Sequence, residues 1–231
     1  MNDSNREPSV IHEDNHIIVI NKPPLLATMG VAEDEQSLVT WTRDWLKAKY
    51  NKPGNVYLGV VSRLDSFTTG LIVMAKTSKA AGRMTKQFQL GEVDKKYTAI
   101  LEQRPDEDQG TLVDWVIKDD RRKRMVVVSD EQNRKGSKRA ELKYRVLGFH
   151  GDLTLVEVEL LTGRKHQIRL QFSDRGWPIL GDRKYQGLEK FYRGIALQSS
   201  ELSFLHPVRR DRMSFRIELP KRWNSARFHT K

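Results

Sequence analysis

Two apolar runs that enclose a short charged loop are the feature that most constrains the fold of this chain. Residues 58–61 are mostly apolar and β-branched, and residues 71–75 form a second apolar run. The turn between the two runs carries Arg63 and Asp65, and Gly70 closes it. Short apolar runs bounded by turn residues are typical of buried strands. We therefore expect Arg63 and Asp65 to lie on a loop held by two strands, where catalytic groups are often found.

Taken alone, this loop also allows a simpler interpretation. Asp65 can cap the turn while Arg63 faces solvent, and charged turns of this kind are common. The rest of the chain has to decide between a structural loop and a functional one.

The composition is that of a soluble globular protein with a nucleic-acid partner. The chain has 231 residues, of which 31% are charged and 38% are apolar, and it contains no cysteine. No apolar run approaches the roughly 18 residues of a membrane span, and the acidic first twenty residues contain no secretory signal, so the expected location is the cytoplasm. The net charge of +11 favours a nucleic-acid partner, although an acidic protein partner is also compatible with it.

Strand patterns outnumber helix patterns along the chain. Strands are expected within residues 9–21 (a pair), 96–101, 111–117, 125–128, 140–147, 153–161, 195–204 and 213–219. Residues 163–175 fit either a strand or a helix. Many strands and about three helices without regular alternation predict a single α+β domain.

Two helices are expected from their N-terminal caps and apolar stripes. Ser37 precedes a stripe formed by Leu38, Trp41, Trp45 and Leu46. Ser78 precedes a second stripe formed by Ala81, Met84 and Phe88, which Gly91 ends.

Several catalytic motifs are absent or misleading. The sequence has no phosphate-binding P-loop, no paired cysteines of a zinc deaminase and no serine-hydrolase elbow. His12 and His16 match the H-E-x-x-H zinc pattern, which requires a helix. An Asp-Asn turn between β-branched segments predicts a hairpin at this place, so we interpret the match as coincidental and expect no metal site.

An ordered series of motifs extends the charged loop. The motifs are SRLDSFTTGLIVMAK at residues 62–76, KKYTA at 95–99, TGRKHQIR at 162–169, PILGD at 178–182 with Tyr185, IAL at 195–197, FLHP at 204–207, and Leu219-Pro220. In order and spacing this set resembles the RluA-type pseudouridine synthases. The resemblance covers residues 10–220, so it implies a stand-alone catalytic domain over 1–231 with a core at about 10–220 and without an N-terminal S4 module. Ser62 departs from the family's usual His, and Lys165 from its usual Thr.

The resemblance implies an isomerase that converts specific uridines of ribosomal or transfer RNA to pseudouridine without cofactor or metal. The implied fold is a pseudouridine-synthase-like α+β domain with a large mixed, mainly antiparallel sheet flanked by a few helices. By the resemblance Asp65, Tyr97 and Arg169 are catalytic: Asp65 acts on the glycosidic bond, Tyr97 stacks on the uracil, and Arg169 pairs with Asp65. Arg63 is expected to fill the gap left by the flipped base.

The resemblance further assigns RNA binding to Arg63, to Lys96 beside Tyr97, and to Arg164 and His166 of the TGRKHQIR motif. The basic runs at residues 118–124 and 134–139 are either solvated loops or phosphate contacts. A monomer that contacts no membrane is expected. The chemical route taken by the aspartate and the identity of the target uridine stay open.

Two alternatives come from other functional classes. A catalytically silent RNA-binding or folding factor would use the same basic surface, but it has little need of the Asp65, Tyr97 and Arg169 set. A nucleoside hydrolase would require a second carboxylate that the sequence does not offer convincingly.

Overall fold

The computed structural model describes residues 7–129, 135–221, 223 and 228–230. The chain folds into two compact units, one made of Met1–Asp94 with Ser199–Ile217 and the other of Lys95–Gln198 with Glu218–Lys231. We refer to them as the first and the second unit. The first contains β1 (Ser9–Glu13), β2 (Ile17–Lys22), α1 (Leu38–Tyr50), β3 (Gly59–Val60), β4 (Thr69–Ala75), α2 (Ser78–Leu90) and β11 (Arg212–Arg216).

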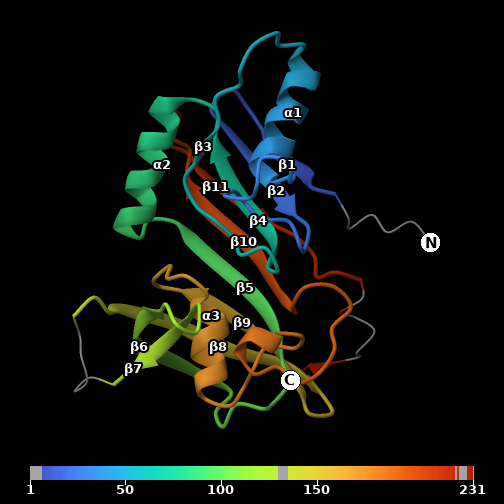
Figure 1. The fold of residues 1–231 in the computed structure, drawn as a ribbon, viewed down its shortest axis with the longest axis vertical. Helices are drawn as coiled ribbons and strands as arrows, with labels where there is room; N and C mark the ends of the chain where they lie inside the picture. Colours follow the sequence, from blue (N-terminus) through green and yellow to red (C-terminus); the bar gives the residue numbers. More distant parts are fainter. Residues whose placement is uncertain (1–6, 130–134, 222, 224–227, 231) are drawn as a thin grey trace. The chain divides into compact units, whose positions relative to one another are not determined.

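The second unit is richer in strands (Figure 1). It contains β6 (Gln109–Asp119), β7 (Arg124–Val128), β8 (Lys138–His150), β9 (Leu153–Leu160), α3 (Gln167–Asp174), the 3₁₀ turn η1 (Arg183–Tyr185) and β12 (His229–Thr230). The chain passes between the units at β5 (Asp94–Leu101) and β10 (Leu197–Leu205). The prediction of one domain over residues 1–231 stays a prediction.

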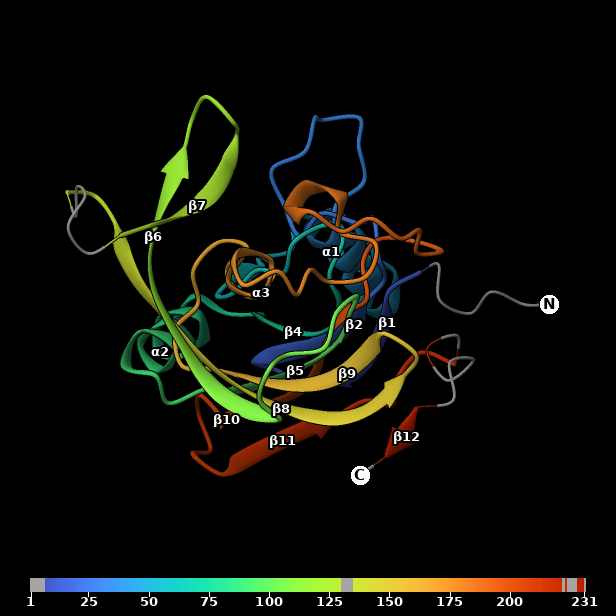
Figure 2. The same cartoon turned by 90° about the horizontal axis from the view of Figure 1, so that it is seen from below.

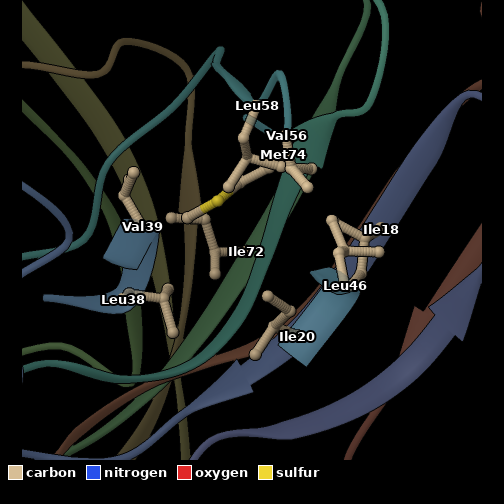
Figure 3. Close-up of a cluster of buried hydrophobic side chains, with 9 residues drawn as sticks. All are labelled: Ile18, Ile20, Leu38, Val39, Leu46, Val56, Leu58, Ile72 and Met74. Atoms are coloured by element: carbon tan, nitrogen blue, oxygen red, sulfur yellow. The ribbon is translucent and has the colours of Figure 1, made fainter. Parts of the chain in front are cut away.

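In the first unit, strands run in the order β1-β2-β4-β10, with β3 on β4 and β11 on β10. Ile18 and Ile20 of β2 pack with Leu38 and Leu46 of α1 in one buried cluster (Figure 3). The alternate residues of β2, Ile17 and Val19, lie in a second cluster with Met84 of α2. Because successive strand residues point to opposite faces, the two helices cover opposite sides of the same strands.

The two helices of the first unit begin at side-chain caps. At α1, the Ser37 hydroxyl accepts a hydrogen bond from the Thr40 amide at 3.2 Å, as predicted for this position. At α2 the cap is Thr77 rather than the predicted Ser78, because the Thr77 hydroxyl accepts from the Ala80 amide. Gly91 ends α2 with a φ of 72° as expected, and its freedom to adopt positive φ is what a helix C-cap requires.

The buried sides of both helices differ in part from the predicted stripes. On α1 the buried residues are Leu38, Val39, Thr42 and Leu46, whereas Trp41 and Trp45 are only partly buried against the cluster. On α2 the buried residues are Ala80, Met84 and Gln87. The wider spread follows from each helix lying flat on strands, which bury a broader face than a narrow stripe.

In the second unit, strands run in the order β5-β9-β8-β6-β7, and β12 pairs with β8. The helix α3 lies on the inner side of this curved set of strands (Figure 2). Leu170 of α3 packs there with Val116 of β6, Ala140 of β8 and Tyr185. The segment that periodicity left undecided is therefore a helix, and it is buried at every position from Gln167 to Ser173.

These observations confirm the predicted α+β class. Every strand pair with an assigned register is antiparallel. His12 lies on β1 and His16 in the turn before β2, so the H-E-x-x-H match is a hairpin, as predicted. Among the described residues, no helix has the length and apolar character needed to cross a membrane.

Candidate active site

The loop with Arg63 and Asp65 connects β3 to β4 in the first unit, as the sequence predicts. Arg63 is exposed and Asp65 is half-buried. The Thr68 amide donates to the Asp65 carbonyl at 3.1 Å, which closes the turn. Gly70 follows with a φ of 106°, and a Cβ at this position would collide with the backbone of Ser199. Only glycine fits this site, so the loop enters β4 in one defined way.

A buried lysine holds this loop from below. Lys22, the last residue of β2, is 0% exposed. Its ammonium donates to the carbonyls of Pro23 at 2.9 Å, Leu26 at 2.8 Å and Ser66 at 3.0 Å. An ammonium has three N–H donors, and all three are used. Lys22 therefore ties the loop after β2 to the residue that directly follows Asp65.

The charge of Lys22 is balanced mainly by Asp65. Burial lowers the pKa of Lys22 to about 7, and the negative charge of Asp65 opposes this shift. A buried cation needs a neighbouring anion or well-aimed acceptors, because removal from water disfavours the charged form. Lys22 thus places positive charge beside the candidate catalytic carboxylate as well as fixing its backbone.

Thr28 provides a second tie between the same two loops. Its hydroxyl donates to the Leu64 carbonyl at 2.8 Å and accepts from the Leu64 amide at 3.2 Å. Leu64 itself packs against the core cluster of α1, β2 and β4. The backbone on either side of Asp65 is thereby anchored, through Leu64 on one side and Ser66 on the other.

Tyr97 and Lys96 lie on β5 in the second unit. Tyr97 is 8% exposed and pairs in register with Val158 of β9. Lys96 is half-buried, and its ammonium lies 3.7 Å from a carboxylate oxygen of Glu157. The two neighbours point to opposite faces of the sheet, since side chains alternate along a strand.

Arg169 forms a two-point ion pair with Asp182. Its Nε lies 2.6 Å from Oδ2 and its Nη2 lies 2.8 Å from Oδ1. The guanidinium carbon also lies 5.0 Å from the centre of the Tyr185 ring. A bidentate pair sets the plane of the guanidinium as well as its position. Arg169 is therefore held in one orientation by residues of its own unit.

The loop that supplies Asp182 and Tyr185 is fastened by Glu102. This buried carboxylate accepts from the amides of Gly181 at 3.3 Å, Leu188 at 2.7 Å and Glu189 at 3.1 Å. Backbone amides that surround a carboxylate satisfy its charge without a counter-ion. Glu102 thereby positions the loop on which the partner of Arg169 is carried.

His166 and Arg164 lie at the start of α3. His166 has a φ of 55°, and its Nδ1 lies 2.8 Å from the Tyr185 hydroxyl. That hydroxyl also accepts from the Met125 amide of β7 at 3.1 Å. Arg164 is exposed, and its Nε donates to the Arg139 carbonyl at 2.9 Å. His166 and Arg169 thus meet at one residue, Tyr185.

The predicted site residues fall into two groups. Arg63 and Asp65 lie in the first unit, and Lys96, Tyr97, Arg164, His166 and Arg169 in the second. The predicted pairing of Arg169 with Asp65 stays a prediction.

Sequence reasoning missed Lys22 and Thr28, and it gave Asp182 and Tyr185 no role. A lysine at the end of an apolar strand, just before two prolines, is the one signal that could have identified Lys22.

Comparison with known proteins agrees with this geometry. The family model for RNA pseudouridylate synthase matches residues 16–174. Ribosomal large subunit pseudouridine synthase D of Zymomonas mobilis is 30% identical over 223 residues, which cover 92% of this chain and 69% of that protein. Dual-specificity RNA pseudouridine synthase RluA of Vibrio vulnificus is 32% identical over 201 residues, 86% of this chain and 78% of its own.

Solved structures show the same fold. Human RNA pseudouridylate synthase domain containing 4 superposes with a TM-score of 0.79 at 25% identity, over 96% of this chain and 94% of that chain. The fold is therefore that of a pseudouridylate synthase domain. With the family model matched over most of the chain, the protein belongs to the RNA pseudouridylate synthase family. It is an isomerase that acts on RNA, and the alternative of a catalytically silent binding factor is set aside.

Proposed function

We propose that this protein converts uridine to pseudouridine in RNA of the large ribosomal subunit, with Asp65 as the essential catalytic residue. The observation that carries the proposal is the double anchoring of the Asp65 loop by Lys22 and Thr28. A fixed carboxylate next to a buried cation is an arrangement expected at a reacting centre, where groups are held in advance of the reaction.

The reaction is an isomerisation and its atoms balance without a co-reactant. The N1–C1′ bond of the uridine breaks, the uracil turns, and a C5–C1′ bond forms. C5 then loses its proton, and N1 takes up a proton. Positive charge builds at the sugar as the glycosidic bond breaks, and a carboxylate such as Asp65 can stabilise or capture it.

Tyr97 and Arg169 are proposed to complete the site. Tyr97 would stack on the uracil and assist the loss of the C5 proton. Arg169 would pair with Asp65, and its bidentate bond to Asp182 would fix the guanidinium in the required orientation. In this proposal both units contribute to a single catalytic domain.

RNA binding is proposed to involve Arg63, Lys96, Arg164 and His166. The target uridine leaves its stack before reaction, at a cost that is smallest in loops. The exposed Arg63 is suited to fill the gap, because a guanidinium plane stacks on bases. The protein is proposed to work as a monomer in the cytoplasm.

The choice of ribosomal RNA follows the names of several relatives. Relatives from Zymomonas mobilis and Rickettsia prowazekii are named as ribosomal large subunit pseudouridine synthases, whereas the Vibrio vulnificus relative is named dual-specificity. The net charge of +11 suits a substrate dense in phosphates.

The test is to incubate the purified protein with unmodified transcripts of large-subunit ribosomal RNA and of transfer RNAs, and to map pseudouridine in each. New pseudouridine at one or a few sites of the ribosomal transcript is expected. Modification of transfer RNA alone would contradict the proposed substrate while leaving the reaction in place.

A further inference from the structure

The loop after β2 contains a leucine in an unfavourable backbone conformation. Leu25 has a φ of 64°, and it is 50% exposed. The left-handed region is disfavoured for residues with a Cβ, and glycine or asparagine is usual there. The core does not explain the leucine, because its neighbour Leu26 is the residue that packs against the cluster of α1, β2 and β4.

The unusual conformation is held by Lys22. The Lys22 ammonium binds the carbonyls of Pro23 and Leu26, which lie on either side of Leu25. The same ammonium binds the carbonyl of Ser66, the residue between Asp65 and Phe67. One buried charge therefore sets both the backbone of Leu25 and that of the Asp65 loop. A strained residue maintained by its surroundings in this way indicates a function.

Two further apolar side chains are exposed along the same pair of loops. Phe67 is 41% exposed and Met29 is 48% exposed. Phe67 follows Ser66, which Lys22 binds, and Met29 follows Thr28, which binds Leu64. We call Leu25, Met29 and Phe67 the apolar rim. Each of its members adjoins a residue that ties the two loops together next to Asp65.

Single exposed apolar residues are common on protein surfaces. The apolar rim differs because its three members belong to the loops that hold the candidate catalytic carboxylate, and because one of them is strained. The exposed cation of Arg63 lies on the same loop as Phe67, so a phosphate backbone can approach this side of the first unit. Unpaired bases are the chemical partners that combine apolar faces with a nearby negative backbone.

We propose that the apolar rim contacts the unstacked bases that flank the target uridine, with Leu25 inserted against the neighbouring base. The inference rests on the proposed function, since it requires Asp65 to meet a uridine taken out of its stack. Apolar side chains are known to separate adjacent bases in this manner, and aromatic rings to support them. Arg63 keeps its separate role of filling the gap.

The decisive variant is Leu25→Gly. Glycine accepts a φ of 64° without strain, so the variant is expected to melt no lower than the wild type. With the ribosomal and transfer RNA transcripts as probes, it is nevertheless expected to lose roughly tenfold in kcat/KM, the size of one lost base contact. Leu25→Asn, which also tolerates this backbone conformation, should behave alike, and Phe67→Ala should add to the loss.

Two control variants separate this effect from general changes. Asn51→Gly alters another exposed left-handed residue, and Leu90→Ala removes another exposed leucine. Both should keep wild-type kcat/KM. A second readout uses an RNA stem-loop around the mapped uridine with 2-aminopurine at the adjacent position. Its fluorescence should rise when wild-type protein separates the bases, and rise less with Leu25→Gly.

The outcomes distinguish the two proposals. An active wild type with an equally active Leu25→Gly variant would overturn the role of the apolar rim and leave the proposed function intact. A wild type that forms no pseudouridine in any transcript would overturn the proposed function, and the apolar rim with it.

Discussion

Arg169 and Asp182 form a bidentate ion pair in the second unit, with side chains that are only 3% and 1% exposed. The pair does not end at these two residues. Tyr185 packs near the guanidinium, and the Glu102 carboxylate fastens the loop that carries Asp182. Positioning of the proposed catalytic arginine thus depends on groups that contact no substrate.

Replacement of Asp182 by Asn should strongly destabilise the second unit. The change leaves a buried guanidinium without its counter-charge, and breaking a buried pair in this way costs about 3–5 kcal/mol. The measurement is the free energy of unfolding in urea. Glu201→Gln removes one side of an exposed pair, since Arg216 is 81% exposed, and should cost at most about 1 kcal/mol. Equal losses in the two variants would contradict the role assigned to burial.

Lys22 should make stability depend on pH in the alkaline range. Burial lowers its folded-state pKa to about 7 from 10.5, with Asp65 opposing. Between these two values the unfolded chain binds more protons than the folded chain, so the contribution of Lys22 to the free energy of unfolding rises with pH. The difference in unfolding free energy between wild type and Lys22→Met should therefore grow in favour of wild type from pH 7 to pH 10.

Urea unfolding of both proteins at pH 6, 8 and 9.5 checks this prediction. Below pH 7 the lysine is charged in both states, so the difference should be flat there. A difference that does not change with pH would mean that Lys22 keeps an ordinary pKa in the folded protein.

Asp14 should contribute stability that is lost in acid. Burial by itself raises its pKa, but hydrogen bonds from the amides of His16 and Ile17 and the nearby rings of His12 and His206 outweigh burial and lower the pKa to about 2. The folded value lies below the ordinary 3.8, so the stability is present above pH 4 and disappears as the pH falls toward 2.

Asp14→Asn should therefore be less stable than wild type at pH 6, and the two proteins should converge near pH 2. Urea unfolding across this range measures the convergence, with the exposed Asp44→Asn of α1 as control. A gap between wild type and Asp14→Asn that persists unchanged at low pH would contradict the assignment.

Much of the fold was predictable because local signals and burial agree. The Asp65 loop, the hairpin at His12 to His16 and the Ser37 cap each follow from turn or capping residues that act locally. The helix α3 was not decidable, because residues buried on all sides carry no periodicity. The helix α2 begins one residue earlier than predicted, since Thr77 and Ser78 are both good caps and only the structure chooses between them.

The site was predictable as a set of motif residues but not as a set of contacts. Nothing in the sequence pairs Arg169 with Asp182, because the partners come from different elements and meet only after folding. Lys22 was understood only as the end of a strand before two prolines. Its bond to Ser66 spans 44 positions of the chain, a distance over which residue patterns give no information.

The turn between β6 and β7 offers a test of RNA binding by charge. Arg121 and Lys123 are exposed there, whereas Arg122 is engaged by Asp119. If both contact phosphates, Arg121→Glu with Lys123→Glu should weaken binding and reduce the slope of log K against log salt by about 1.5–2. Filter binding at several salt concentrations measures this slope.

A matched control makes the same change of net charge elsewhere. Lys79→Glu with Lys86→Glu reverses two exposed charges on α2 in the first unit. An equal effect of both double variants would show that net charge, and not the β6–β7 turn, governs binding.

The most direct test of the central claim concerns Asp65 alone. An RNA transcript labelled with tritium at C5 of uridine releases that tritium when C5 joins C1′. The wild type and Asp34→Asn, a change to an exposed aspartate of another loop in the same unit, should release it at the same rate. Asp65→Asn should bind the RNA as tightly as the wild type and release essentially none. Release by Asp65→Asn at the wild-type rate would contradict its role as the catalytic residue.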